Sequence, residues 1–212
     1  MNNQAHRGGV ILAGGRSRRF GNEDKALASL QSKPLIAHVV DRLDPAVSEL
    51  VINCRSEQQA RITDALAPSS IDVIMAPDPN PDRGPLAGIK TGLTALENVD
   101  TAFVTACDMP LIEPELIEFL FAGLTEAEAV VPRLDDEWLQ TTHAVYRCES
   151  MIDACDATLA EGDGRIVSAI DRLNVRIIEV ERIRQYGSLD SFFNINTNED
   201  LEAAECKLSD SD

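Results

Sequence analysis

Short apolar runs alternate with longer amphipathic stretches along the first 125 residues of the chain. Nearly every position in the short runs is apolar, which is typical of strands that are covered on both faces. The longer stretches repeat apolar positions every three or four residues, which predicts helices. The expected strands are 8–13, 49–54, 71–76 and 101–106, and the expected helices are 34–44, 57–67, 86–97 and 114–124.

This alternation predicts an α/β fold with three α/β/α layers, in which helices cover both faces of a mostly parallel, twisted sheet. Beyond residue 125 the pattern loosens, and we expect this part to form a lid or substrate platform within the same domain. The expected strands there are 128–132, 140–147, 175–180 and 192–197, and the expected helices are 149–160, 165–173 and a last one that Thr197 caps.

Composition excludes several classes of protein. The chain has 212 residues, of which 44% are hydrophobic, so it can bury a sizeable core. It contains no apolar run of membrane-spanning length, and its first residues lack the pattern of a signal peptide. The five cysteines are odd in number and include no CxxC pair. We therefore expect neither a disulfide framework nor a zinc site, which fits a cytoplasmic protein.

The formal net charge is −17, from 36 acidic and 19 basic residues. Such an acidic surface argues against binding to nucleic acids or membranes, which requires a basic face. Only four of the basic residues are lysines, so the surface suits a high-salt cytoplasm, where counterions screen the self-repulsion. Ordinary solubility charge explains the composition equally simply.

Four of the 19 basic residues stand within residues 16–25, in the segment "LAGGRSRRFGNEDK". This segment directly follows the first expected strand, where α/β sheets bind their ligands. Gly14 and Gly15 let backbone N–H groups approach a ligand, and arginine forks and a lysine suit phosphate oxygens. The alternative is a glycine-rich turn whose arginines face solvent. GxxxxGK[ST] and GxGxxG are both absent, which excludes a P-loop and weakens a dinucleotide-dependent oxidoreductase.

Two acidic residues follow other expected strands at the same edge of the sheet. Asp108 comes directly after strand 101–106, where a carboxylate beside a phosphate loop is a candidate Mg²⁺ ligand. Its alternative role is to cap the next helix. Asp78 begins the stiff loop "DPNPDRGP" and is a candidate acceptor of hydrogen bonds from a ribose or a guanine edge, unless the loop is a plain turn.

Four segments together resemble the nucleotidyltransferases of the molybdenum cofactor guanylyltransferase type. They are "LAGGRSRRFGNEDKAL", "GPLAGI", "TACDMP" and "NINTNEDL", which occur in the family's order. The resemblance extends from residue 10 to about 204 and implies a Rossmann-like nucleotidyltransferase fold. The chain contains no evident linker and only its polar end looks disordered, so we expect a single domain over 1–206 and a disordered tail at 207–212. Within this domain we expect a nucleotide-binding half near 8–125 and an acceptor-binding half near 126–206.

The resemblance further implies which residues form the site. In the family a nucleoside triphosphate lies along the first glycine loop, with Mg²⁺ on an aspartate. The implied catalytic residues are Arg19, Lys25 and Asp108, and Asp108 is also the implied Mg²⁺ ligand. The implied nucleotide-binding residues are Leu12, Ala13, Gly14, Gly15, Lys25, Asn53, Asp78 and Asp108. The implied acceptor-binding residues are Gly84, Gly88, Asn194 and Asn196.

The implied reaction transfers GMP from GTP to the terminal phosphate of molybdopterin and releases pyrophosphate. Cytidylyl-transferring relatives generally read "LAAG", so the glycine at position 14 favours guanine. The sequence departs from the family at Asn22, where a glycine is common, and at Thr141, where "QPLHALYR" has a proline. His143 in this segment is as compatible with a pterin contact as with a structural role in a strand.

Three alternatives stay open at this stage. The enzyme could transfer cytidylyl groups to the same cofactor, or guanylyl groups to another phosphorylated acceptor such as a cobamide precursor. A GTP-binding cofactor adaptor would share the loop but would not need Asp108. We expect GTP and molybdopterin as ligands, with transient contacts to molybdoenzymes or to other proteins of cofactor synthesis.

Overall fold

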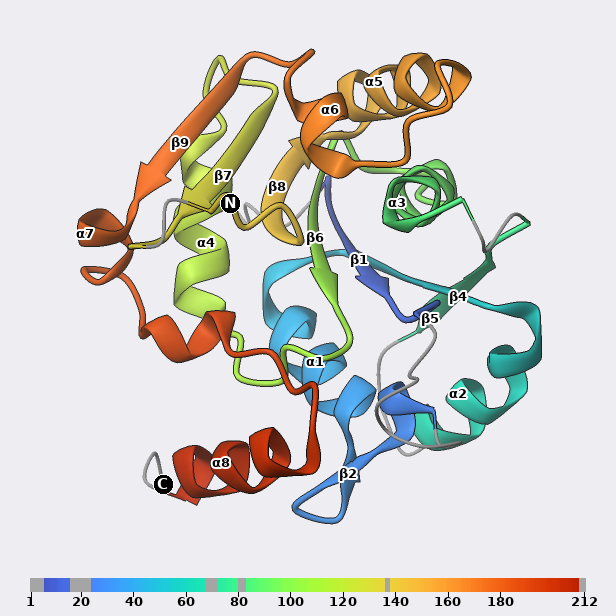
Figure 1. The fold of residues 1–212 in the computed structure, drawn as a ribbon, viewed down its shortest axis with the longest axis vertical. Helices are drawn as coiled ribbons and strands as arrows, with labels where there is room; N and C mark the ends of the chain where they lie inside the picture. The colour runs from blue at the N-terminus through green and yellow to red at the C-terminus, as the bar shows by residue number, and fades with distance from the viewer. Residues whose placement is uncertain (1–5, 16–23, 68–71, 80–82, 136–137, 210–212) are drawn as a thin grey trace.

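The computed structural model describes residues 6–15, 24–67, 72–79, 83–135 and 138–209. A seven-stranded sheet runs through the middle of the molecule, with the strand order β5-β4-β1-β6-β8-β7-β9 (Figure 1). Only β8 runs against its neighbours β6 and β7, and the other pairings in the sheet are parallel. The strands are β1 (Arg7–Leu12), β4 (Glu49–Cys54), β5 (Val73–Pro77), β6 (Thr101–Ala106), β7 (Ala129–Arg133), β8 (His143–Arg147) and β9 (Val175–Glu179).

Helices cover both faces of this sheet, which confirms the predicted three-layer architecture. One layer contains α1 (Leu35–Leu43), α2 (Gln59–Leu66) and α4 (Pro114–Gly123), and the other contains α3 (Pro85–Thr94), α5 (Cys148–Ala160) and α6 (Ile166–Ile170). Alternate strand residues feed the two cores: Ile11 packs with the first layer and Val10 with the second. The apolar runs in the sequence reflect this burial on both sides.

Helix α3 packs especially closely on the sheet because it carries glycines on the face that it buries. A Cβ atom at Gly92 would stand 2.3 Å from a methyl group of Val10. A Cβ atom at Gly88 would stand 2.6 Å from Oδ1 of Asn53. The backbone of α3 therefore lies against the strands that hold the site.

The structure adds several short elements. A small hairpin, β2 (Ser29–Leu30) and β3 (Lys33–Pro34), turns through Gln31 and Ser32, which both have positive φ angles. Short 3₁₀ turns occupy Lys25–Leu27, Asp44–Ala46, Ser56–Gln58 and Leu189–Phe192, and the one-turn helix α7 spans Val180–Ile183.

Two expectations for the end of the chain are wrong. Residues 192–197 do not form a strand, because both sides of β6 are already occupied by β1 and β8; instead the segment lies beside Asp108, whose carbonyl oxygen accepts a hydrogen bond from Ile195 N at 2.9 Å. Helix α8 (Asn198–Ser209) continues past the expected break at residue 207, since Lys207 forms an ion pair with Asp190 at 2.6 Å. The last residues, 210–212, lie outside the described part.

The expected cap of this last helix is confirmed. Thr197 Oγ1 accepts a hydrogen bond from Asp200 N at 3.1 Å, while Asp200 Oδ2 accepts from Thr197 N at 2.9 Å. All five cysteines are free thiols. In the described part of the chain, no helix has both the length and the apolar character needed to cross a membrane.

Candidate active site

The parallel strands β4, β1 and β6 end side by side, and residues 13–15, which follow β1, lie at this edge. Two backbone hydrogen bonds extend the sheet beyond the strand ends: Ala13 N donates to the carbonyl oxygen of Asn53 at 2.7 Å, and Cys107 N donates to that of Leu12 at 3.0 Å. Residues that are far apart in the sequence are thereby held together at the carboxyl edge of the sheet, the edge at which open α/β sheets bind ligands.

Several expected nucleotide-binding residues gather on one side of this edge. Asn53 is buried and its amide donates to the carbonyl oxygen of Ala76 at 3.1 Å. Asp78, which is 8% exposed, is anchored by its backbone N–H, which donates to the carbonyl oxygen of Cys54 at 2.8 Å. A Cβ atom at Gly14 would stand no closer than 3.8 Å to Asn53 Oδ1, and one at Gly15 would meet nothing within 4 Å. Among the described residues, the turn therefore borders open space at Gly15, whereas a Cβ atom at Gly14 would make ordinary van der Waals contact with Asn53.

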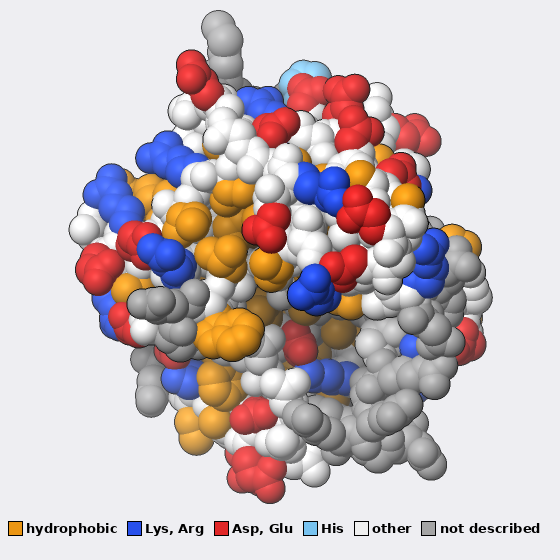
Figure 2. All heavy atoms as spheres, turned by 45° about the horizontal axis from the view of Figure 1, so that its top comes forward, with side chains coloured by type: hydrophobic (Ala, Val, Ile, Leu, Met, Phe, Trp, Pro, Cys, Tyr) orange, Lys and Arg blue, Asp and Glu red, His pale blue; other side chains and the backbone are white. Residues whose placement is uncertain are grey.

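Lys25, Asp108 and Asn196 form a second group at the same edge. Lys25 Nζ donates to Asp108 Oδ2 at 2.5 Å and to Asn196 Oδ1 at 2.9 Å. The Lys25 and Asp108 side chains are only 14% and 19% exposed. The structure thus joins three expected site residues from distant parts of the chain. Figure 2 shows that the molecule is hollowed near the centre of this view, with side chains of both charges inside the hollow.

One carboxylate oxygen of Asp108 indicates whether a metal ion would fit this site. Its Oδ1 atom is buried and has no hydrogen-bond partner among the described residues. A carboxylate oxygen that has lost its water and has no donor is costly, and a cation satisfies it. Mg²⁺ favours one or two carboxylates together with phosphate oxygens, so Asp108 fits this role. Within the described residues, no three His, Cys, Asp or Glu side chains converge to form a complete metal site.

The expected acceptor-binding residues are divided by the structure. Gly84 precedes α3 with φ +85°, and a Cβ atom there would stand 3.4 Å from the carbonyl oxygen of Gly164. The N-terminal end of α3 therefore faces the loop between α5 and α6. Gly88 instead lies buried against Asn53, one of the expected nucleotide-binding residues. Asn194 donates to the carbonyl oxygen of Phe192 at 3.2 Å.

Arg19 and Asn22 lie outside the described residues, so their roles stay predictions. His143 is fully buried between Phe103 and Phe192, with ring centroids 4.9 and 4.4 Å away. Burial lowers the pKa of His143 to about 3, so its ring is neutral and shielded from any acceptor. The structural role is therefore the one that its position supports.

Sequence reasoning missed the segment that supports the glycine turn. Arg55 Nε donates to the carbonyl oxygen of Gly14 at 2.8 Å, and Gln58 Nε2 donates to that of Ala13 at 3.2 Å. It also missed the loop around Asp163, whose carboxylate accepts from the backbone and side chain of Arg165. Two glycines between helices in "EGDGR" were the available signal for the second, whereas nothing in the sequence distinguishes Gln58 from its neighbour Gln59.

No thiol near the site is suited to act as a nucleophile. Burial raises the pKa of Cys54 to about 11, and it raises that of the fully buried Cys107 further. Both side chains therefore remain protonated near neutral pH and act as small apolar groups.

Comparison with known proteins identifies the family of this chain. The model of the MobA-like NTP transferase domain matches residues 9–176. The chain is 44% identical to a protein of Natronomonas pharaonis named "Probable molybdenum cofactor guanylyltransferase", over 96% of this chain and 98% of that one. It is 35% identical to the "Molybdenum cofactor guanylyltransferase" of Yersinia pestis (strain Pestoides F), over 94% of this chain and 95% of that one.

A solved structure is similar over nearly its whole length. It is the molybdopterin-guanine dinucleotide biosynthesis protein A from Archaeoglobus fulgidus, with a TM-score of 0.78 and 30% identity, covering 96% of this chain and 99% of that one. A second solved structure, 4-diphosphocytidyl-2C-methyl-D-erythritol synthase from Anaerococcus prevotii, shares the fold at a TM-score of 0.73 and only 15% identity, covering 98% of this chain and 97% of that one. The chain therefore belongs to the family of the MobA-like NTP transferase domain.

Proposed function

We propose that this protein transfers GMP from GTP to the terminal phosphate of molybdopterin, forming the guanine dinucleotide cofactor and pyrophosphate. The observation that carries the proposal is the group of Lys25 and Asp108, held at the edge of an open glycine turn. The names of the relatives support guanine as the base and the molybdenum cofactor as the acceptor.

The chemistry requires positioning and charge control more than a general base. An oxygen of the acceptor phosphate, which is already anionic, forms a bond to the α-phosphorus of GTP. The bond from that phosphorus to the oxygen that bridges to the β-phosphate breaks, and pyrophosphate leaves with the electron pair. The protein must therefore bring two anions together and stabilise the charge on the leaving group.

The described residues can supply both effects. Backbone N–H groups of the glycine turn approach the phosphates, and the ammonium of Lys25 holds the β- and γ-phosphates as they depart. When bound at Asp108, Mg²⁺ would supply a Lewis acid that withdraws charge from the phosphates. Asn53 and Asp78 would orient the nucleoside, while Asn196 steadies Lys25. Arg19 remains a proposed catalytic residue, and Gly84 and Asn194 remain proposed acceptor contacts.

The proposal is tested by mixing the purified protein with Mg²⁺, molybdopterin and each of the four nucleoside triphosphates, and by measuring pyrophosphate. We expect release with GTP only. Release with CTP would instead make it a cytidylyltransferase. Guanylyl transfer that occurs only with another phosphorylated acceptor would mean that this acceptor, and not molybdopterin, is the substrate. GTP binding without any pyrophosphate release would favour a cofactor adaptor and refute an enzyme.

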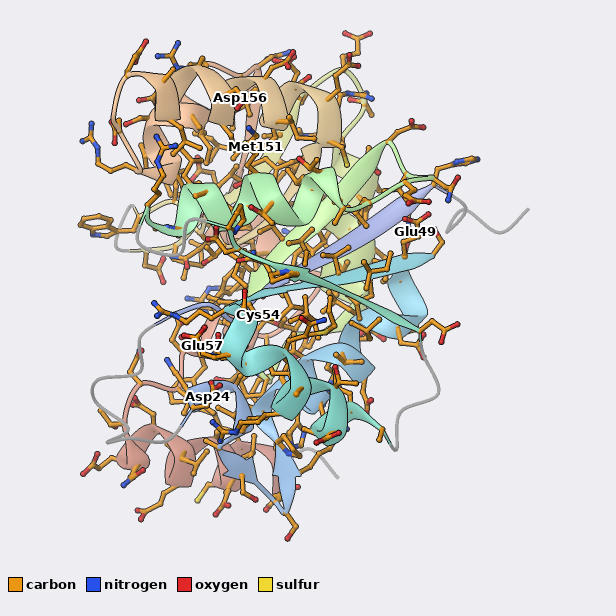
Figure 3. All side chains as sticks on the ribbon, turned by 90° about the vertical axis from the view of Figure 1, so that its right-hand side faces the viewer. Asp24, Glu49, Cys54, Glu57, Met151 and Asp156 are labelled. Carbon is orange, nitrogen blue, oxygen red and sulfur yellow. The ribbon has the colours of Figure 1, made fainter. Side chains whose placement is uncertain are left out.

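A variant tests the role of the aspartate. Asp108→Asn keeps the shape of the side chain and removes its charge, so we expect transfer to fall by roughly a hundredfold or more while the melting temperature changes little. Asp156→Asn is the matched control, because Asp156 lies on α5 and pairs with Lys90, in the upper layer of Figure 3, well separated from Asp24 and Cys54. Unchanged transfer in Asp108→Asn would refute the metal and phosphate role.

Two wider expectations belong to this proposal. A cytoplasmic location fits free thiols and an intracellular cofactor. Transient contact with molybdoenzymes, or with other proteins of cofactor synthesis, would pass the product on. Co-purification of the guanine dinucleotide cofactor with such a complex would support that contact.

A further inference from the structure

The side chain of Gln58 is buried between two segments of the candidate site, with only 7% of its surface exposed. It lies in the 3₁₀ turn Ser56–Gln58 that follows β4. Its Nε2 atom donates to the carbonyl oxygen of Ala13 at 3.2 Å and to Asp24 Oδ2 at 2.8 Å. Its Oε1 atom accepts from the backbone N–H of Arg55 at 2.8 Å. Both polar atoms of the amide, Nε2 and Oε1, are therefore hydrogen-bonded.

The partners fix the orientation of this amide. The Ala13 carbonyl and the Asp24 carboxylate can only accept hydrogen bonds, and the Arg55 N–H can only donate. A reversed amide would place an acceptor against two acceptors and a donor against a donor. Gln58 therefore has one satisfied orientation and cannot rotate without losing all three bonds.

The two segments that Gln58 joins carry the two ends of the phosphate-binding loop. Ala13 begins the glycine turn, while Asp24 directly precedes Lys25 and caps the next turn by accepting from Ala26 N at 3.2 Å. Figure 3 shows Cys54 near the middle of the molecule, with Glu57 and Asp24 below it on the same side. The amide thus spans from the end of β4 to both ends of the loop.

We propose that Gln58 is a positioning residue that sets the distance between the glycine-turn backbone and the Lys25 ammonium, and thereby the fit to a GTP triphosphate. This inference rests on the proposed function and goes beyond it by assigning a residue that touches neither substrate. Because the bridge orients groups that bind GTP, its loss affects GTP and leaves the acceptor side unchanged.

The first test compares steady-state kinetics of Gln58→Met and Gln59→Met. Methionine has nearly the length of glutamine and no hydrogen-bond donor. We expect the KM for GTP to rise roughly tenfold in Gln58→Met, because the side chain loses all three hydrogen bonds that hold the two segments together. The KM for molybdopterin should stay unchanged. Gln59 is the adjacent glutamine and is exposed, so Gln59→Met should behave like the unaltered enzyme.

Two further variants keep the proposal testable if Gln58→Met folds poorly. Gln58→Glu keeps the bond to Arg55 N but turns a carboxylate oxygen toward two acceptors, so we expect a larger rise in the KM for GTP. Asp24→Ala removes the other end of the same bridge while position 58 stays glutamine. It should therefore raise the KM for GTP without changing that for molybdopterin, and the double variant Asp24→Ala, Gln58→Met should be less than additive.

Several outcomes would overturn the positioning role. One such outcome is a KM for GTP that stays unchanged in Gln58→Met, Gln58→Glu and Asp24→Ala. Another is an equal rise in the KM for GTP and the KM for molybdopterin. A lower melting temperature with unchanged kinetics would mean that Gln58 is merely structural. If the unaltered protein binds GTP by calorimetry but transfers nothing, the proposed function fails while the dissociation constants still decide the role of Gln58. If it binds no GTP, both proposals fall.

Discussion

Replacing His143 with leucine tests whether a buried imidazole makes the fold sensitive to acid. His143 is fully buried, and neither of its ring nitrogens has a hydrogen-bond partner in the described structure. Burial lowers its pKa from 6.5 to about 3, because the charged ring would lose its hydration without gaining a partner. The folded protein therefore holds a neutral ring at pH values where the unfolded chain is protonated.

The magnitude follows from the difference in proton uptake. Between about pH 7.5 and about pH 5, the unfolded chain binds a proton at this residue and the folded chain does not, so stability falls as the pH falls. For these two pKa values, the loss of unfolding free energy amounts to about 2 kcal/mol. A leucine cannot bind the proton, so the His143→Leu variant should lose about 2 kcal/mol less than the unaltered protein over the same interval. Other titrating groups, including His38, are present in both proteins and cancel.

The assay is urea unfolding of both proteins at the two pH values, at one constant ionic strength. Urea is preferable to guanidinium here, since a salt would screen the large acidic charge of the chain. Ile117→Val is the control, because Ile117 is equally buried and cannot titrate; it should cost about 1 kcal/mol at both pH values. Parallel losses in His143→Leu and the unaltered protein would refute the argument and mean that the imidazole can be protonated in the folded state.

Two other predictions concern the site and its support. Lys25→Ala should raise the KM for GTP at least tenfold while that for molybdopterin changes little, since the ammonium is expected to hold the departing phosphates; equal losses in steady-state kinetics would contradict this assignment. Gly92→Ala should lower the unfolding free energy by about 1–3 kcal/mol in urea titration, because its Cβ would stand 2.3 Å from Val10. Unchanged stability would mean that α3 can move away from the sheet at little cost.

Much of the first half of the fold could be predicted from periodicity. The apolar runs at β1, β4 and β6 coincide with strands within one residue, because a strand buried on both faces leaves the same pattern wherever it pairs. The last segment was harder, since "FFNINT" has the alternation of a strand. Strand formation also requires an open neighbour in the sheet, and both sides of β6 were already taken.

The candidate site could also be predicted from the sequence only in part. Positions such as Gly14 and Asp108 could be predicted, because a glycine-rich turn and an aspartate directly after a buried strand are typical of a ligand-binding edge. Gln58 gave no such signal, because a glutamine after a strand is ordinary until its partners are known. The sequence left His143 equally compatible with a pterin contact and a structural role, and only its burial between two phenylalanine rings favours the structural role.

The sequence by itself determined the layered α/β architecture, the acidic composition and the position of a glycine-rich turn after the first strand, because each depends on local pattern or on residue type. Only the tertiary structure decided that Lys25 meets Asp108 and Asn196, that a glutamine bridges the two ends of the turn, and that β8 runs against its neighbours. Those features depend on contacts between residues separated by tens of positions, and such contacts are selected by packing and hydrogen-bond satisfaction across the whole core, which no short window of sequence records.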